Sequence, residues 1–302
     1  KNGSIYLTGG NEGLVSVSGN IDATGLGTNE TGGIVHVLGN RVGLYDYARI
    51  DVSGDAGGGL ILVGGDYQGL GLIPTAVDNY VGPNVSIFAD AVTGGDGGRT
   101  IFWADRRTEF FGTIKARGGR LFGDGGFAEV SGKEELYFVG SVDTTAPNGK
   151  SGTLLLDPDY ITVSGGSGTA SASGASSFTT YEDILESVAS TTNIEMIATN
   201  SITFNNSLSF AQTAGQSVTF TATNGNISVT DSTDTIETSG GSIIMTAGGT
   251  LSIGAVDTNG GDITLTGAEF TLSGALDAGV GTVTILGASG ETIGLDGTTA
   301  ST

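Results

Sequence analysis

GGIVHVLG, residues 32–39, is one copy of a pattern that recurs along the chain. A pair of glycines precedes a short apolar run, and a further glycine closes it. The stretch GGLILVGG at 58–65 repeats this arrangement. Apolar residues in so short a run, bounded by glycine, indicate a β-strand between turns. Further copies of the motif are GRTIFW at 98–103, GFAEVSG at 126–132 and GTLLL at 152–156.

A second motif follows the first in most repeats. It consists of an apolar residue, an acid, a small or β-branched residue, any residue and glycine, as in IDATG at 21–25, IDVSG at 50–54 and IETSG at 236–240. In the last third, Gly241, Gly261 and Gly281 open alternating strands at intervals of 20 residues. Two or more strands in so short a repeat are typical of one coil of a β-solenoid.

The sequence therefore predicts an all-β chain that forms a right-handed parallel β-helix of about a dozen coils. Residues 1–160 are expected to form its first part, and 193–302 a continuation with 20-residue coils. Between them, 161–192 are expected to form a glycine- and serine-rich linker with a short helix, which Thr180 would cap. Residues 66–84, which contain two prolines, are expected to protrude as a loop. We expect the motif glycines at turns, where a positive φ costs them nothing.

Other repeat folds fit less well. A propeller blade repeats after about 40–50 residues, and a sandwich has no repeated motif. Calcium-binding nonapeptide solenoids need Gly-Gly-x-Gly-x-Asp in tandem. Stretches such as GGDGG at 94–98 are similar, but they recur once in each coil.

Charge narrows the classes of function. The net charge is −21, and all 11 lysines and arginines lie within residues 1–150. That segment has a net charge of −6, and residues 151–302, with 15 acids and no lysine or arginine, have −15. Such a surface repels nucleic acid and anionic lipid, so neither is expected as a partner.

Cysteine content and the start of the chain add further limits. Without cysteine, the chain has no disulfide scaffold and no cysteine-ligated metal. We predict no cofactor. Calcium bound by the acidic turns stays an open alternative, because charge alone does not show it. No apolar run is as long as a membrane helix. The chain begins with a strand-like run, SIYL at 4–7, and not with a signal peptide, so we expect a mature or truncated piece of a longer protein.

No residue pattern predicts a catalytic, cofactor or metal site. The best cluster is Asp105-Arg106-Arg107 with Glu109, which we interpret as a turn with solvated charges. Asp157-Pro158-Asp159 likewise predicts a turn, and His36, the one histidine, supports neither a triad nor a metal site. Aromatic residues near Trp103 and Tyr137 would form either an outer platform for sugar or protein or a ladder inside the coil. The candidate contact surface is Trp103, Asp105, Arg106, Arg107 and Tyr137.

Several stretches resemble the filamentous haemagglutinin family of bacterial exoproteins. These are FWAD at 102–105, TEFFGTIKARGG at 108–119, GDGGFAEVSGK at 123–133, APNG at 146–149 and GTLLLDP at 152–158. The resemblance covers about half of the chain. It implies a secreted or surface-exposed bacterial protein, commonly exported through an outer-membrane partner, with a role in adhesion, aggregation or biofilm formation.

Three hypotheses of function follow. The favoured one is a non-catalytic adhesin stalk, extracellular or on the bacterial surface, whose partner is a glycan or protein of a host or neighbouring cell. The second is a subunit of an extracellular fibre, in which uncapped coil edges stack end to end. The third is a β-helical polysaccharide lyase or hydrolase, which we disfavour because no set of carboxylates supports it.

Overall fold

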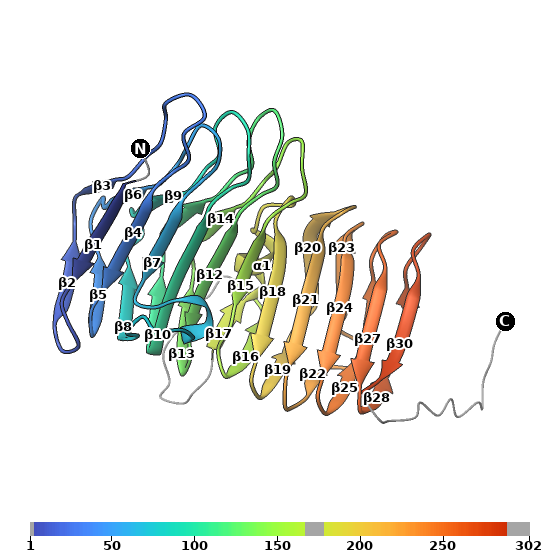
Figure 1. Cartoon of the computed structure of the whole chain (residues 1–302). Helices are drawn as coiled ribbons and strands as arrows, with labels where there is room; N and C mark the ends of the chain where they lie inside the picture. The colour runs from blue at the N-terminus through green and yellow to red at the C-terminus, as the bar shows by residue number, and fades with distance from the viewer. Residues whose placement is uncertain (1–2, 167–177, 289–302) are drawn as a thin grey trace.

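The computed structural model describes residues 3–166 and 178–288, and these residues form a parallel β-helix (Figure 1). One sheet runs the whole length of the solenoid, with one strand from each of eleven coils in chain order and every neighbour parallel. Ten intervals of about 4.8 Å make this stack about 48 Å long. The predicted fold class is confirmed.

Three faces enclose the core. The first face contains β1 (Ser4–Thr8), β4 (Ile34–Leu38), β7 (Leu60–Val63), β10 (Arg99–Phe110), β12 (Phe127–Gly132), β15 (Thr153–Leu156), β18 (Asn193–Ala198), β21 (Ser217–Ala222), β24 (Ser242–Ala247), β27 (Ile263–Gly267) and β30 (Val283–Gly287). The second contains β2 (Leu14–Val17), β5 (Arg41–Leu44), β8 (Ala76–Val81), the end of β10, β13 (Glu135–Phe138), β17 (Phe178–Tyr181), β16 (Tyr160–Ser164), β19 (Ser201–Phe204), β22 (Ile227–Val229), β25 (Thr250–Ile253) and β28 (Glu269–Leu272). The third contains β3 (Asn20–Asp22), β6 (Arg49–Asp51), β9 (Ser86–Phe88), β11 (Thr113–Lys115), β14 (Ser141–Asp143), β20 (Leu208–Thr213), β23 (Thr235–Ser239), β26 (Ala255–Asp257) and β29 (Leu276–Asp277).

Alternation along each strand places one side chain in the core and the next outside. In the first face, Ile194, Val218, Ile243 and Ile263 are register partners in successive coils, and all four are fully buried. Each such side chain contributes roughly 1.5–3 kcal/mol by leaving water. The 20-residue period predicted for the last coils is confirmed by the pairing of Ile243 with Ile263 and of Ile263 with Val283. A single apolar cluster continues from Val17 to Ala278.

The motif glycines have two different causes. Gly64 and Gly240 have the positive φ that was expected, whereas Gly98 and Gly126 do not. A Cβ on Gly126 would lie 2.1 Å from the carbonyl oxygen of Gly98, and one on Gly98 would lie 2.3 Å from the carbonyl oxygen of Gly59. These glycines are therefore required because neighbouring coils approach too closely for a side chain.

The range 161–192 contains structure where a linker was expected. β17 pairs with β16 and packs against β13, so it lies between the two in the second face. The predicted helix is present as α1 (Glu182–Glu186), which packs against β20 and buries Leu185. Thr180 does not cap it, because Thr180 is a buried residue of β17 and the residue at the cap position is Tyr181. The rest of the predicted linker, 167–177, lies outside the described residues.

The loop expected at 66–84 is also shorter than predicted. Ala76–Val81 form β8, a regular strand that pairs with β5 and β10. The remaining insertion contains a short 3-10 helix, η1 (Tyr67–Gly69), and lies against the outer surface of the first face instead of protruding (Figure 1). Among the described residues, no helix is long and apolar enough to cross a membrane.

Candidate functional site

The insertion at residues 64–75, here called the strap, covers Trp103 on the outside of the first face. Trp103 points away from the core, yet it is only 6% exposed, and Leu62 and Ile101 beside it are buried as well. A Cβ on Gly69 would lie 2.4 Å from the indole, so the strap backbone lies directly on the ring. Trp103 is therefore neither the exposed platform nor the inner ladder residue considered from the sequence.

Asp105 holds the end of the strap. Its carboxylate accepts a hydrogen bond from the Trp103 indole Nε1 at 3.2 Å and another from the Thr75 hydroxyl. The buried Asn79 side chain donates to the carbonyl oxygens of Val63 and Trp103, at 3.1 and 2.6 Å, and so fixes the end of β7, where the strap begins, and the adjacent part of β10. Asp105 thus has a structural role beside Trp103.

The other predicted contact residues lie on the second face, in a separate group. Arg106 pairs with Asp78 of the preceding coil, and Arg107 pairs with Glu109 at 3.1 Å. Tyr137 is the register partner of Glu109 one coil further on, and partial burial raises its pKa. Both arginine side chains remain about one-third or more exposed. Alternating charges of neighbouring coils neutralise one another there, as in a solvated ladder.

The inner aromatic ladder consists of other residues. Phe102, Phe110 and Phe138 are fully buried, and the rings of Phe110 and Phe138 stack with their centroids 5.9 Å apart. His36 points outward between Val35 and Val37, and its ring meets that of Tyr6 edge-on at 4.7 Å. Burial lowers the pKa of His36. This outward orientation is the one that its place in the strand predicted.

Two carboxylic acids bind the tip of the strap. The Gln68 backbone N–H donates to Glu129 Oε1 at 3.0 Å, and the Gln68 Nε2 donates to Asp157 Oδ2 at 2.7 Å. Glu129 occupies an outward position of β12, but the strap leaves it fully buried. Among the described residues, Glu129 Oε2 has no hydrogen-bond partner. The two acids therefore fasten a loop to the outside of the solenoid through a single glutamine.

Burial makes both acids unusually weak. It raises the pKa of Glu129 to about 8, although the hydrogen bond from Gln68 opposes the shift. It raises the pKa of Asp157 to about 6, with a further contribution from the negative charges of Asp159 and Glu195. Because desolvation disfavours the charged form, Glu129 is mainly protonated at neutral pH. Sequence reasoning missed this pair, since Asp157 was interpreted as part of a turn and nothing local shows that a distant strap covers Glu129.

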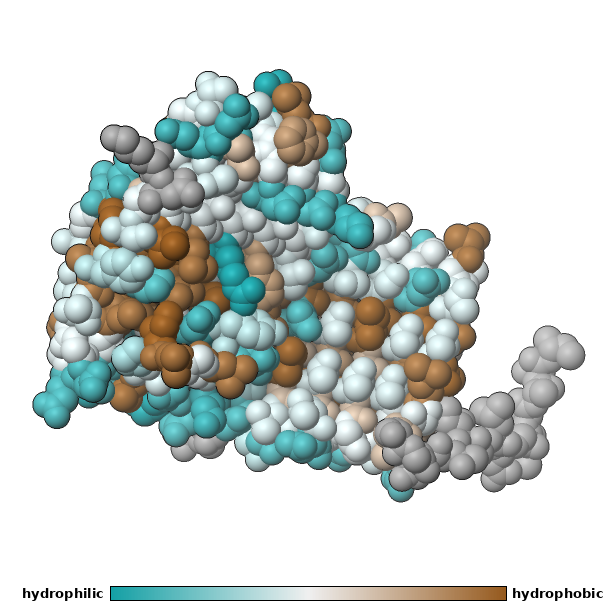
Figure 2. Space-filling view, viewed as in Figure 1, coloured by the Kyte–Doolittle hydropathy of each residue, from teal (hydrophilic) through white to brown (hydrophobic). Residues whose placement is uncertain are grey.

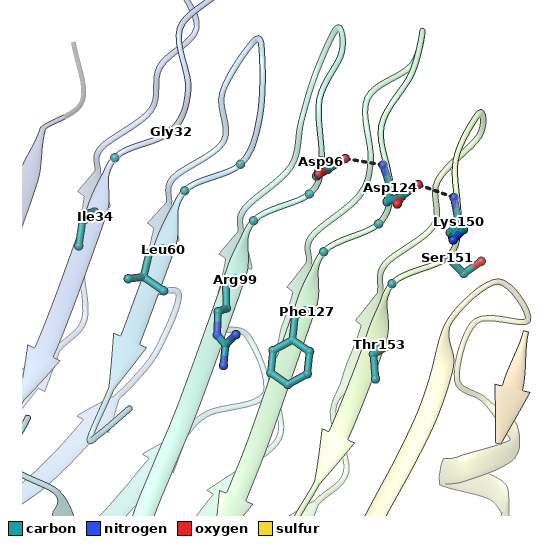
Figure 3. A pocket seen from close by; sticks show the side chains of 18 of the residues that line it. Gly32, Ile34, Leu60, Asp96, Arg99, Asp124, Phe127, Lys150, Ser151 and Thr153 are labelled. Atoms are coloured by element: carbon teal, nitrogen blue, oxygen red, sulfur yellow. Dashed lines mark hydrogen bonds between the residues drawn. The ribbon is translucent and has the colours of Figure 1, made fainter. Parts of the chain in front are cut away.

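A groove runs along the axis beside the strap, where the third face turns into the first. The connections 23–33, 52–59, 89–98, 116–126 and 144–152 rise there as arches (Figure 1), and their feet form one wall. The groove has a volume of about 750 Å³. Its floor is the first outward side chain of six successive coils, namely Ser4, Ile34, Leu60, Arg99, Phe127 and Thr153 (Figure 3).

Hydrogen bonds between arches fix the charged residues along the wall. Asp96 Oδ1 accepts from the Asp124 backbone N–H, and Asp124 Oδ1 accepts from the Lys150 backbone N–H, each at 2.7 Å (Figure 3). Each carboxylate is thereby oriented by a backbone N–H of the next coil. The wall thus repeats a polar group in each of three adjacent coils.

An aromatic and cationic cluster lies where the strap meets the groove. The Arg99 guanidinium lies 4.8 Å from the centre of the Tyr67 ring and 4.7 Å from that of Phe127. The two rings contact each other edge-on, with their centroids 5.9 Å apart. Contact with both rings fixes the arginine in the groove floor, and such contacts are worth about 0.5–1 kcal/mol each at exposed sites.

Figure 2 shows brown, apolar residues gathered over the first coils and rows of pale polar residues over the last ones. Thr219, Thr221, Thr264 and Thr266 point outward from β21 and β27 in the last coils. In the described parts of the chain, no group of three or more His, Asp and Glu side chains is arranged to hold a metal ion.

No protein-family model matches the chain, and no curated protein matches it either.

Proposed function

We propose that this chain is a non-catalytic β-helical stalk of a bacterial surface or secreted adhesin. The observation that carries the proposal is the distribution of features along the rod. Within the described residues, one apolar core continues through all eleven coils, whereas the arches, the strap and the groove occur only in the first six. A uniform core makes a stiff spacer, and additions on one side of a solenoid make a contact surface.

The resemblance to filamentous haemagglutinins supports the same proposal, because it lies mostly in the coils that carry these additions. The acid pair does not favour an enzyme. Glu129 is fully buried, and both acids are hydrogen-bonded to Gln68 in a closed contact. A general acid must reach its substrate, so this pair is better explained as a fastening for the strap.

Adhesion is tested with beads coated with the full chain and allowed to settle on epithelial cells and on bacterial cells. We expect the coated beads to adhere to at least one of the two more strongly than beads coated with albumin. Equal adherence of both kinds of bead to every surface would refute the proposal. Electron microscopy of the same material distinguishes a stalk from the alternative, a fibre subunit. A fibre subunit would form continuous filaments, and a stalk would appear as single short rods.

A further inference from the structure

We propose that the groove between the arches and the first face binds an extended, uncharged glycan that lies along the solenoid axis. This inference rests on the proposed adhesin function and names the class of ligand and the residues that contact it. The central contacts are Leu60, Arg99 and Phe127 on the floor, and Asp96 and Asp124 on the wall.

The shape of the groove favours a linear polymer. Its floor takes one side chain from each of six coils, so it extends over about five intervals, or roughly 24 Å. The coils repeat along this line with nearly constant spacing, and a polymer that crosses them meets one floor side chain in each coil. A small compact ligand would use only a fraction of such a site.

The chemistry of the groove fits sugar rings. A pyranose has apolar C–H faces and a rim of hydroxyl groups. The ring of Phe127 and the side chain of Leu60 offer apolar surface, and stacking against an aromatic ring is worth about 0.5–1.5 kcal/mol beyond area burial. Asp96 and Asp124 offer carboxylate oxygens that accept from hydroxyls, and Arg99 and Lys150 donate to them.

The charge of the groove and of the whole protein favours an uncharged glycan as the ligand. The charged residues that line the groove are two aspartates, one arginine and one lysine, so their net charge is zero. The chain as a whole carries −21, and this field repels polyanions such as acidic polysaccharides. An uncharged glycan meets neither local nor long-range repulsion.

An extended peptide fits less well. A peptide that adds to a sheet needs free backbone N–H and C=O groups to pair with. Along this groove the N–H groups of the motif glycines already donate within the solenoid, as from Gly98 to the Ala89 carbonyl, from Gly126 to that of Ala116 and from Gly152 to that of Thr144. The ligand must therefore be held by side chains.

The test is affinity electrophoresis of the full chain through gels that contain one polymer each. The uncharged polymers are galactomannan, xyloglucan, mixed-linkage β-glucan and dextran; hyaluronan and polygalacturonate represent anionic glycans, and gelatin represents polypeptide. We expect retardation by at least one uncharged glycan, and Phe127→Ala should weaken it at least tenfold. Tyr160→Ala, which removes an exposed aromatic ring of β16 on the second face, is the matched control and should bind as the parent does.

Retardation by none of the uncharged glycans, or only by hyaluronan, polygalacturonate or gelatin, would overturn the inference. Equal retardation of the Phe127→Ala variant and its parent would also do so. Thermal melting shows whether each variant is folded. If Phe127→Ala is not, Asp124→Asn is used, because its amide oxygen still accepts from the Lys150 N–H; it should weaken binding several-fold, and unchanged binding counts against the groove.

The two proposals fail in different ways. Beads coated with Phe127→Ala that adhere as well as the parent would exclude the groove as the adhesive site and leave the adhesin function standing. Parent beads that do not adhere, together with a chain that is retarded by an uncharged glycan, would leave the groove standing and remove the adhesin function.

Discussion

The first six coils and the last five have the same interior and different exteriors. In both, fully buried apolar residues pair coil to coil, as Ile50 with Ile87 in the third face and Ile243 with Ile263 in the first. Outside, the first six coils carry the arches, the strap and all the lysines and arginines from Arg41 to Lys150. In the last five coils, short turns join the third face to the first, as between β23 at Ser239 and β24 at Ser242.

The core of a solenoid therefore does not indicate its function. The core is repeated with small variations, and it determines where each coil lies. What is inserted at the turns then decides which outer surface is flat, grooved or covered. Core substitutions that destabilise the two regions unequally would contradict this view. Additions of the first coils that respond independently of the core would support it.

The largest effect is expected from a charge in the core of either region. Ile114→Asp in the first coils and Ile263→Asp in the last would each bury an unpaired carboxylate at a fully buried position. Each should destabilise its coils by about 3–5 kcal/mol and lower the thermal midpoint clearly. Thr264→Asp, at the adjacent outward position of β27, should have little effect. A clear drop for only one of the two isoleucines would mean that the interiors are not equivalent.

A somewhat smaller loss is expected from a methyl group between coils. Gly126→Ala would place its Cβ 2.1 Å from the Gly98 carbonyl oxygen, so the coils must separate or the backbone must shift. Overpacking of this kind costs about 1–3 kcal/mol. Gly19→Ala is the control, because its Cβ would have no atom within 4 Å. Chemical denaturation of both variants checks this, and equal stability would show that coil spacing is softer than the stack implies.

The strap should respond to pH, because the pKa values of Glu129 and Asp157 are raised in the folded protein to about 8 and about 6. When protonated, acids of this kind stabilise the closed strap. This stabilisation is complete at pH values below their ordinary pKa values of 4.5 and 3.8. That contribution falls as the pH rises and is lost once the pH has passed through the raised values. Trp103 is the sole tryptophan, so acrylamide quenching of its fluorescence reports whether the strap is closed.

We expect quenching to increase between pH 5 and pH 9 and the thermal midpoint to fall by several degrees. Glu129→Gln keeps an acceptor for the Gln68 N–H and cannot ionise, so it should flatten most of this pH dependence. A parent protein with constant quenching over the range would show that the strap does not depend on the two acids.

The smallest effect is expected on the second face. Arg106→Ala removes an ion pair with Asp78 whose arginine is 40% exposed. Pairs of this kind contribute up to about 1 kcal/mol, and less at high salt. Denaturant titration at low and high salt measures it. A loss above about 2 kcal/mol would mean that the charge ladder holds the first coils together.

The fold was predictable because its repeat is local. Each coil carries its own apolar run and its own glycines, so periodicity identifies strands such as β4 and β7 without knowledge of their neighbours. The cause of the glycine pairs was not predictable in the same way. A positive φ and a close approach both demand glycine. Only the folded structure shows that Gly126 lacks a positive φ and that a Cβ on it would lie 2.1 Å from the Gly98 carbonyl oxygen.

The site was less predictable because it joins residues far apart in sequence. Gln68 meets Glu129 and Asp157 at separations of 61 and 89 residues. An acid at an outward strand position normally indicates a solvated face, and no local pattern shows that a strap lies over it. Trp103 is a similar case, since the sequence left both an outer platform and an inner ladder open, and only the structure shows an outward residue that the strap buries.

The way in which the three faces pass from the first six coils to the last five has a mechanical consequence. The first face continues unbroken from β1 to β30. Within the described residues, the third-face sheet that ends at β14 is separate from the one that contains β20, and β13 and β17 belong to different sheets. A pulling force along the axis would therefore be carried across this junction mainly by the first face. When the rod is stretched between two surfaces, we expect this junction to unfold first and to leave two shorter folded solenoids.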